Sequence, residues 1–120
     1  MPRDQRSYLA DIVESCDAIE SALRNLDLGT YRENRLIRSS VEREFIIIGE
    51  AMAALARIVP ATFGAITRAR RIVDFRNQLT HEYPTVDDTV VWAIAETDVP
   101  VLRRECAALI DRAASTDEDG

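Results

Sequence analysis

Apolar residues recur at three- and four-residue steps along nearly the whole chain, and no other feature restricts its fold more strongly. This spacing gathers apolar side chains on one side of an α-helix, whereas a half-buried β-strand needs strict alternation. The first series contains Leu9, Ile12, Val13, Cys16, Ile19, Leu23 and Leu26. It predicts an amphipathic helix, for which Gly29 is the expected C-terminal stop.

The second series is longer and reaches Pro60. Its members are Leu36, Ile37, Val41, Phe45, Ile48, Met52, Leu55 and Val59. They predict a helix of about seven turns. Residues 45–54 (FIIIGEAMAA) are mostly apolar or small, which indicates burial on more than one side and would suit a dimer interface. Within this run, Gly49 would allow close helix approach, and Glu50 is expected to pair with Arg43, because an unpaired buried carboxylate is costly.

The third predicted helix follows a turn-like segment at residues 60–64 (PATFG). It is expected from about Ala65, and Pro84 closes it, because proline disfavours helical backbone in the residue before it. Its apolar side consists of Ile72, Phe75 and Leu79.

Acidic residues mark the start of the remaining helical pattern. Asp87 or Asp88 can cap a helix through the apolar run that follows them. Asp98 and Pro100 suit a fresh start into the last apolar series. Either two short helices or one kinked helix satisfies this pattern.

These patterns together predict an all-α protein, because no segment shows sustained strand-like alternation. Amphipathic helices joined by short connections bury their apolar sides against one another, usually near-antiparallel. We therefore expect an antiparallel helical bundle of four to five helices. It forms a single domain over residues 1–115, followed by a disordered acidic tail at residues 116–120.

Composition argues against several classes of protein. The formal net charge of −6 disfavours nonspecific coating of nucleic acid, because that affinity comes mainly from neutralised phosphates. No apolar run approaches the roughly 20 residues that span a bilayer, and the N-terminus lacks the apolar core of a signal peptide. A cytoplasmic protein without membrane contact is expected. Cys16 and Cys106 lack metal-ligand spacing and are expected to be buried thiols.

His81 is the only histidine, so any imidazole acid–base chemistry must pass through it. At about 100° per helical residue, one polar sector gathers around it. This sector contains Arg70, Asp74, Asn77 and His81, with Arg76 and Tyr83 beside it. A solvated helix face, with Asp74 paired to Arg70, would give the same spacing, and spacing alone favours that interpretation.

The string RNxxxHxY at residues 76–83 resembles the R-x4-H-x-Y signature of HEPN-domain ribonucleases in their HepT-like branch. The likeness extends to other segments. IIIGEAMAAL resembles that branch's GEA-containing helix, and Val41 to Arg43 resembles the segment leading into it. VDDTVVW and the later VPVL resemble its downstream pattern. The resemblance covers roughly Leu9 to Ile110 and implies a HEPN-like bundle.

This resemblance implies a metal-independent endoribonuclease that uses no cofactor, with Arg76 and His81 as its catalytic residues. A ribose 2′-hydroxyl attacks the adjacent phosphate while His81 moves the proton and Arg76 stabilises the charge on the nonbridging oxygens. The product would carry a 2′,3′-cyclic phosphate. One chain supplies one imidazole, and members of the family pair two motifs across a dimer cleft, so a homodimer is expected.

Other polar residues of the third helix are expected to support this chemistry. Asn77 could orient the His81 ring or contact phosphate, and a simple helix-end hydrogen bond is the alternative. Asp74 could hold Arg70 or Arg76 in place. An arginine cluster would attract RNA phosphates, with ordinary solvated arginines as the alternative. Its members are Arg68, Arg70 and Arg71, near Arg76.

The resemblance also implies partners. In HepT-like toxins the antitoxin is a minimal nucleotidyltransferase that transfers AMP to the motif tyrosine, which is Tyr83 here. The expected substrate is RNA, possible examples being tRNA and mRNA. The alternative function is a subunit that binds nucleotide or nucleic acid for a nucleotidyltransferase without cleaving RNA. The intact pair of Arg76 and His81 argues against that alternative.

Overall fold

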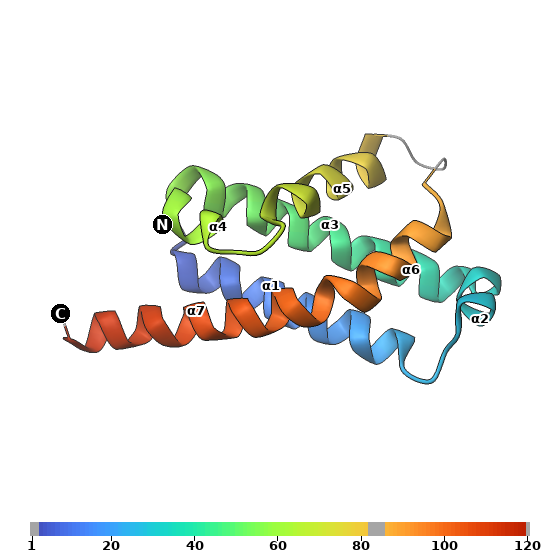
Figure 1. Cartoon of the computed structure of the whole chain (residues 1–120), viewed down its shortest axis with the longest axis horizontal. Helices are drawn as coiled ribbons and strands as arrows, with labels where there is room; N and C mark the ends of the chain where they lie inside the picture. The colour runs from blue at the N-terminus through green and yellow to red at the C-terminus, as the bar shows by residue number, and fades with distance from the viewer. Residues whose placement is uncertain (1–2, 82–85, 120) are drawn as a thin grey trace.

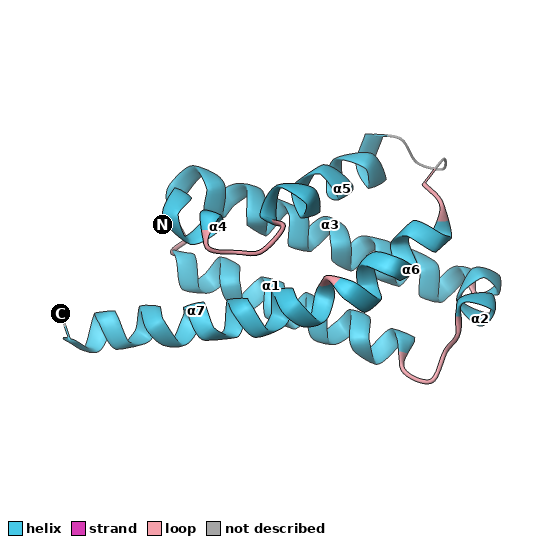
Figure 2. Ribbon diagram, in the orientation of Figure 1, coloured by secondary structure: helices cyan, strands magenta, loops and turns pink. Residues whose placement is uncertain are grey.

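The computed structural model describes residues 3–81 and 86–119, and every regular element in these two ranges is a helix (Figures 1 and 2). The helices are α1 (Gln5–Leu23), α2 (Leu28–Glu33), α3 (Arg35–Ile58), α4 (Pro60–Gly64), α5 (Ala69–His81), α6 (Asp88–Thr97) and α7 (Val99–Asp119). The predicted all-α class is confirmed. Seven helices occur over these residues because α2 and α4 are short helices in the connections between the long ones.

The long helices alternate in direction along the long axis of the molecule (Figure 1). Helix α3 packs against both α1 and α5, and α7 packs against α1. The core between them contains Leu9, Ile12, Ile19, Val41, Phe45, Ile48, Met52, Leu55, Phe75, Leu79 and Leu102. Phe45 and Phe75 meet edge to face, with ring centroids 5.1 Å apart, and so join α3 to α5 beside the conserved spacing of apolar residues on each helix. The antiparallel bundle therefore forms as expected.

The end of α1 differs from the prediction. The helix stops at Leu23, and Asn25 adopts a left-handed backbone with φ of 66°, a conformation that asparagine tolerates better than most residues. Asp27 then accepts a hydrogen bond from the Thr30 backbone N–H at 2.8 Å and caps α2. Gly29 thus lies in the first turn of a second helix, and its predicted role as a helix stop is wrong.

The connection from α3 to α5 also differs. Residues 60–64, predicted as a turn, form α4, because Pro60 fits the first turn of a helix, where its missing N–H costs nothing. Helix α5 begins at Ala69 rather than near Ala65. Before it, Arg68 has a positive φ of 56°, and the Thr67 backbone N–H donates to a Glu105 carboxylate oxygen at 2.8 Å. The start of α5 is therefore fastened to α7.

The last third of the chain forms two helices, which decides between the two predicted alternatives. The Asp87 side chain accepts from the Thr89 backbone N–H at 2.8 Å and caps α6, and Asp98 lies where α6 meets α7. Helix α7 continues past residue 115 to Asp119. The division of the chain into a domain over residues 1–115 and a disordered tail stays a prediction.

Both cysteines are free and buried, as predicted. Cys16 on α1 and Cys106 on α7 have no solvent-exposed surface. Burial raises the pKa of the Cys106 thiol to about 12 and raises the pKa of Cys16 further. The two thiols therefore act as core side chains where α1 packs against α7. Over the described ranges, no helix has the length and hydropathy needed to cross a bilayer.

Candidate active site

Helix α5 separates its apolar and polar residues as the sequence predicted. Its buried residues are Ala69, Ile72, Val73, Phe75 and Leu79. Its opposite side is exposed and carries Arg70, Asp74, Asn77 and His81. Burial of the apolar side against α3 fixes the rotation of the helix, so the polar sector faces solvent.

Arg76 crosses α3 at Gly49. A Cβ atom added to Gly49 would lie 2.2 Å from the Arg76 Cβ and 2.4 Å from its Cγ, much closer than two carbon atoms can approach. The glycine is therefore required for the arginine stem to lie on α3. The expectation that Gly49 allows close helix approach is confirmed, and its partner is the predicted catalytic arginine.

The Arg76 guanidinium has one satisfied and one unsatisfied donor. Its Nη1 donates to the Asn77 Oδ1 at 2.7 Å, so Asn77 contacts the arginine next to it. Its Nε is buried and has no hydrogen-bond partner among the residues described. A buried donor without an acceptor costs free energy, which an incoming acceptor such as a phosphate oxygen would recover.

His81 is the last residue of α5 and is exposed. The preceding residue, Thr80, donates its hydroxyl to the backbone carbonyls of Arg76 and Asn77, each at 3.2 Å, and so supports the last turn. A separation of five residues places Arg76 and His81 about 140° apart around the helix. The two side chains therefore leave α5 in different directions, Arg76 over α3 and His81 toward solvent.

Two other predicted site residues have no described contact with the pair. Tyr83 lies outside the described residues. Asp74 is exposed, and no ion pair joins it to Arg70 or Arg76. Arg70 instead places its guanidinium over the Phe63 ring, 5.3 Å from the centroid. The proposed role of Asp74 as a support for the arginines has no contact behind it in the single chain.

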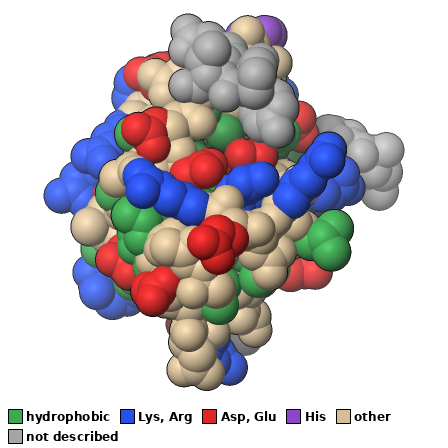
Figure 3. Space-filling model, turned by 90° about the vertical axis from the view of Figure 1, so that its right-hand side faces the viewer, with side chains coloured by type: hydrophobic (Ala, Val, Ile, Leu, Met, Phe, Trp, Pro, Cys, Tyr) green, Lys and Arg blue, Asp and Glu red, His purple; other side chains and the backbone are tan. Residues whose placement is uncertain are grey.

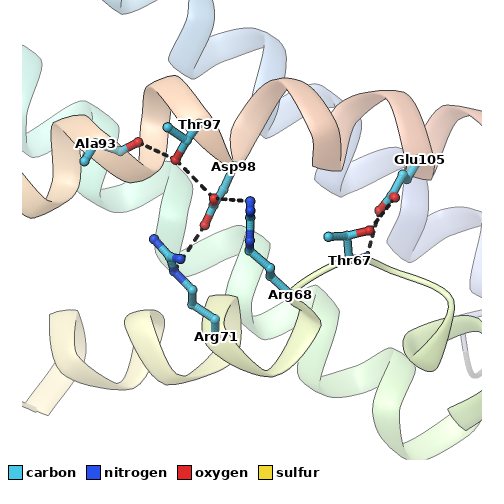
Figure 4. Close-up of polar contacts among 7 residues, drawn as sticks. All are labelled: Thr67, Arg68, Arg71, Ala93, Thr97, Asp98 and Glu105. Atoms are coloured by element: carbon cyan, nitrogen blue, oxygen red, sulfur yellow. Dashed lines mark hydrogen bonds and ion pairs between the residues drawn. The ribbon is translucent and has the colours of Figure 1, made fainter.

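Asp98 binds two of the arginines that were predicted to attract RNA (Figure 4). This carboxylate is only 4% exposed, and its oxygens lie 3.1 Å from the Arg68 Nη1 and 3.4 Å from the Arg71 Nε. Thr97 donates a further hydrogen bond to it at 3.1 Å. Both arginines keep about half of their side-chain surface exposed, at 49% and 53%. They anchor the start of α5, and their role in RNA binding stays a prediction.

A second group of arginines lies at the end of the bundle where α5 finishes. Arg32 of α2 donates to the Thr89 hydroxyl of α6, and Arg38 of α3 lies 3.9 Å from Asp88 and donates to the Arg32 carbonyl at 2.9 Å. Figure 3 shows this end with a band of arginine side chains, and with the histidine at its edge. Sequence reasoning missed this group because its members belong to helices far from α5 in the chain.

A groove of about 610 Å³ runs between α3 and α5 beside the motif. It is lined by Ser39, Glu42, Arg43, Ile46, Ile47, Glu50, Leu79 and Thr80. Burial, together with the nearby Asp88 carboxylate, raises the pKa of Glu42. Glu50 is exposed in the groove and forms no ion pair with Arg43. The expected burial and pairing of Glu50 within one chain is therefore wrong, because α3 turns this residue away from α1 and α5.

The candidate site offers an arginine, an asparagine and an imidazole. No group of three or more histidine, cysteine, aspartate or glutamate side chains is arranged to hold a metal ion in residues 3–81 and 86–119. The arrangement supplies a cation for a phosphate and one group that exchanges protons near neutral pH.

Comparison with known proteins places this arrangement in a family. The family description "Ribonuclease HepT-like" matches residues 12–109. The chain is 31% identical to "Putative RNase MJ1380" of Methanocaldococcus jannaschii, over 86% of this chain and 94% of that protein. It is 29% identical to "Probable ribonuclease HepT" of Thermococcus cleftensis, over 86% and 93% of the two chains. No solved structure matches the chain at a significant level.

The matched region contains the whole of α3 and α5, and so includes Gly49, Arg76 and His81. It also covers most of α1 and all of α6, which with α3 form the core around the motif. The chain therefore belongs to the HepT-like ribonuclease family.

Proposed function

We propose that this HepT-like protein is a metal-independent endoribonuclease in which Arg76 and His81 act on the phosphodiester. The observation that carries the proposal is the seat of Arg76: its stem lies on Gly49, and its buried Nε has a proton to donate and no partner among the described residues. A phosphate oxygen is the acceptor that a planar guanidinium fits best. The exposed His81 lies five residues further along the same helix.

The chemistry follows from these two groups. A ribose 2′-oxygen attacks phosphorus and loses its proton to an imidazole, while Arg76 stabilises the negative charge that gathers on the nonbridging oxygens. The P–O5′ bond then breaks, and the leaving oxygen takes a proton from a second imidazole. The products are a 2′,3′-cyclic phosphate and a 5′-hydroxyl end.

A homodimer supplies the second imidazole. The chain has one histidine, whereas the reaction is fastest with both an acid and a base in place. Within one copy, Arg76 and His81 also leave α5 in different directions, so a site shared between two copies can bring one arginine and two imidazoles to one phosphate. Asn77 would then hold Arg76 through the 2.7 Å bond to its Nη1.

The test is cleavage without metal. Purified protein is incubated with tRNA and with mRNA in EDTA, and the product ends are identified. We expect fragments with 2′,3′-cyclic phosphate and 5′-hydroxyl ends, and none from the Arg76→Ala/His81→Ala double variant purified in the same way, which controls for contaminating nucleases. Absence of cleavage combined with tight nucleotide binding would favour the alternative, a non-catalytic subunit of a nucleotidyltransferase complex.

The same proposal includes regulation by AMP. We infer that the protein is the toxin of a toxin–antitoxin pair and that a minimal nucleotidyltransferase blocks it by attaching AMP to Tyr83, two residues after His81. Added phosphate charge there would repel an RNA phosphate. Co-expression with the nucleotidyltransferase of the same operon should add the mass of AMP to the wild type and not to Tyr83→Phe. Equal labelling of both proteins would remove Tyr83 from this role.

A further inference from the structure

The outward face of α3 carries two opposite charges separated by apolar residues. Arg43 and Glu50 are both exposed, and Ile46 and Ile47 between them are only partly buried. Seven residues correspond to two helical turns, so the two charges lie on one side of α3, roughly 10 Å apart. An exposed glutamate in the middle of the sequence FIIIGEAM is unusual for a core helix, and it shows that this side of α3 is left uncovered by α1 and α5.

Hollows flank this face on both sides. The groove of about 610 Å³ separates it from α5, and two smaller hollows of about 420 and 140 Å³ separate it from α1. Ile47 lines all three, Arg43 lines the first two, and Glu50 lines the first and the third. The face is therefore a ridge between grooves, the shape that lets two helices pack ridge into groove.

The ridge is complementary to itself. A two-fold axis that passes between Ile46 and Ile47 reverses the order of the residues along α3, because positions 43 and 50 are equally far from that point. It brings Arg43 of one copy opposite Glu50 of the other and repeats the same pair on the far side. A two-fold interface requires this reciprocity, in which each residue meets its counterpart's partner.

We propose that the α3 ridge, formed by Arg43, Ile46, Ile47 and Glu50, is the surface on which a second copy of this chain docks, held by two reciprocal Arg43–Glu50 ion pairs. The inference rests on the proposed nuclease, since it supplies the second protomer that the reaction needs. A second copy is the occupant that the charges select, because any other partner would have to repeat the same reversed charge order.

This placement has a consequence for the site. Leu79 and Thr80 of α5 line the groove into which the partner's ridge would pack. Thr80 immediately precedes His81, and Gly49, which seats Arg76, immediately precedes Glu50. The interface would therefore run beside both catalytic residues of each copy and bring the two motifs to one side of the dimer.

Charge reversal tests the interface. In Arg43→Glu two pairs of glutamates face each other across the axis, and in Glu50→Arg two pairs of arginines do. Like charges placed opposite one another strongly disfavour association, so we expect each variant to self-associate at least about 100-fold more weakly in analytical ultracentrifugation. An equimolar mixture of the two variants places each new charge opposite its complement, and so does the double variant R43E/E50R. Both should dimerise within about tenfold of the wild type.

The mixture separates the interface from damage to the fold, because each chain in it still carries its own substitution. Circular dichroism and thermal unfolding of each variant provide the second control. Single variants that dimerise like the wild type, or a mixture that stays monomeric, would overturn the proposal. So would reversals that leave the dimer intact and weaken only the binding of the co-expressed nucleotidyltransferase, since the ridge would then belong to that partner.

The outcome for the nuclease is read separately. Dimerisation is measured without RNA, so a dimer that follows the charge pattern and cuts no RNA would support the interface and contradict the nuclease. Cleavage that is equally fast in R43E, E50R and the wild type, with all three monomeric, would support the nuclease and contradict the interface.

Discussion

Gly49→Ala is expected to destabilise the protein by about 2–3 kcal/mol, which is opposite to the usual effect of this substitution. In an open helix, alanine is favoured over glycine by about 1 kcal/mol. Here the new methyl group would lie 2.2 Å from the Arg76 Cβ. Both carbons are attached directly to backbone, so no side-chain rotation can separate them, and α3 and α5 must move apart. Chemical denaturation of the two proteins measures the difference.

Gly64→Ala is the matched control. Gly64 ends the short helix α4, has no positive φ, and has no atom within 4 Å of the position that a Cβ would take. Alanine there is expected to leave the stability unchanged or to raise it by up to about 1 kcal/mol. If Gly49→Ala were as stable as Gly64→Ala, Arg76 would not lie against Gly49 as the structure shows.

The Gly49 substitution should also lower RNA cleavage. Because Gly49 seats the Arg76 stem, moving α5 outward displaces the guanidinium, and a misplacement of about 1 Å can cost about 100-fold in rate. Cleavage is measured well below the unfolding midpoint, so that the folded protein alone is assayed. Unchanged cleavage by the folded variant would show that the position of Arg76 over α3 is unimportant for the reaction.

The sequence predicts the long helices well where apolar periodicity is uninterrupted. Helix α3 follows its apolar series almost to the residue, between the Asn34 cap and Pro60. The short helices α2 and α4 escaped prediction because five or six residues hold too few turns to show a period. The signals that could have revealed them are local, namely Asp27 three residues before Thr30 and a proline in a first helical turn.

The candidate site could be predicted only in part. The spacing within α5 gave the polar sector, because that sector depends on one helix alone. The contact between Arg76 and Gly49 joins residues 27 positions apart in the sequence and depends on how α3 and α5 pack. The same holds for Asp98, whose burial depends on the meeting of α5 with the α6–α7 junction. No one-helix pattern contains that information.

His81→Ala is expected to lower the rate of RNA cleavage by about 10²- to 10⁴-fold while leaving the stability nearly unchanged. The rate falls because the only imidazole of the chain is lost, and the stability holds because the side chain is exposed at a helix end. Gln78→Ala is the matched control, since Gln78 is also exposed on α5 and has no proposed role. Single-turnover cleavage by both variants measures the effect on the chemical step.

Mixing the wild type with His81→Ala chains then asks whether two imidazoles serve one phosphate. With the variant in large excess, nearly every wild-type chain has a variant partner, and each such dimer holds a single imidazole. If acid and base come from different copies, activity per wild-type chain should fall by about 10²-fold or more. If each chain supplies all of its own chemistry, activity per wild-type chain should stay constant, and a site shared across the two-fold axis would be ruled out. The measurement therefore decides whether the unit of catalysis is the chain or the pair.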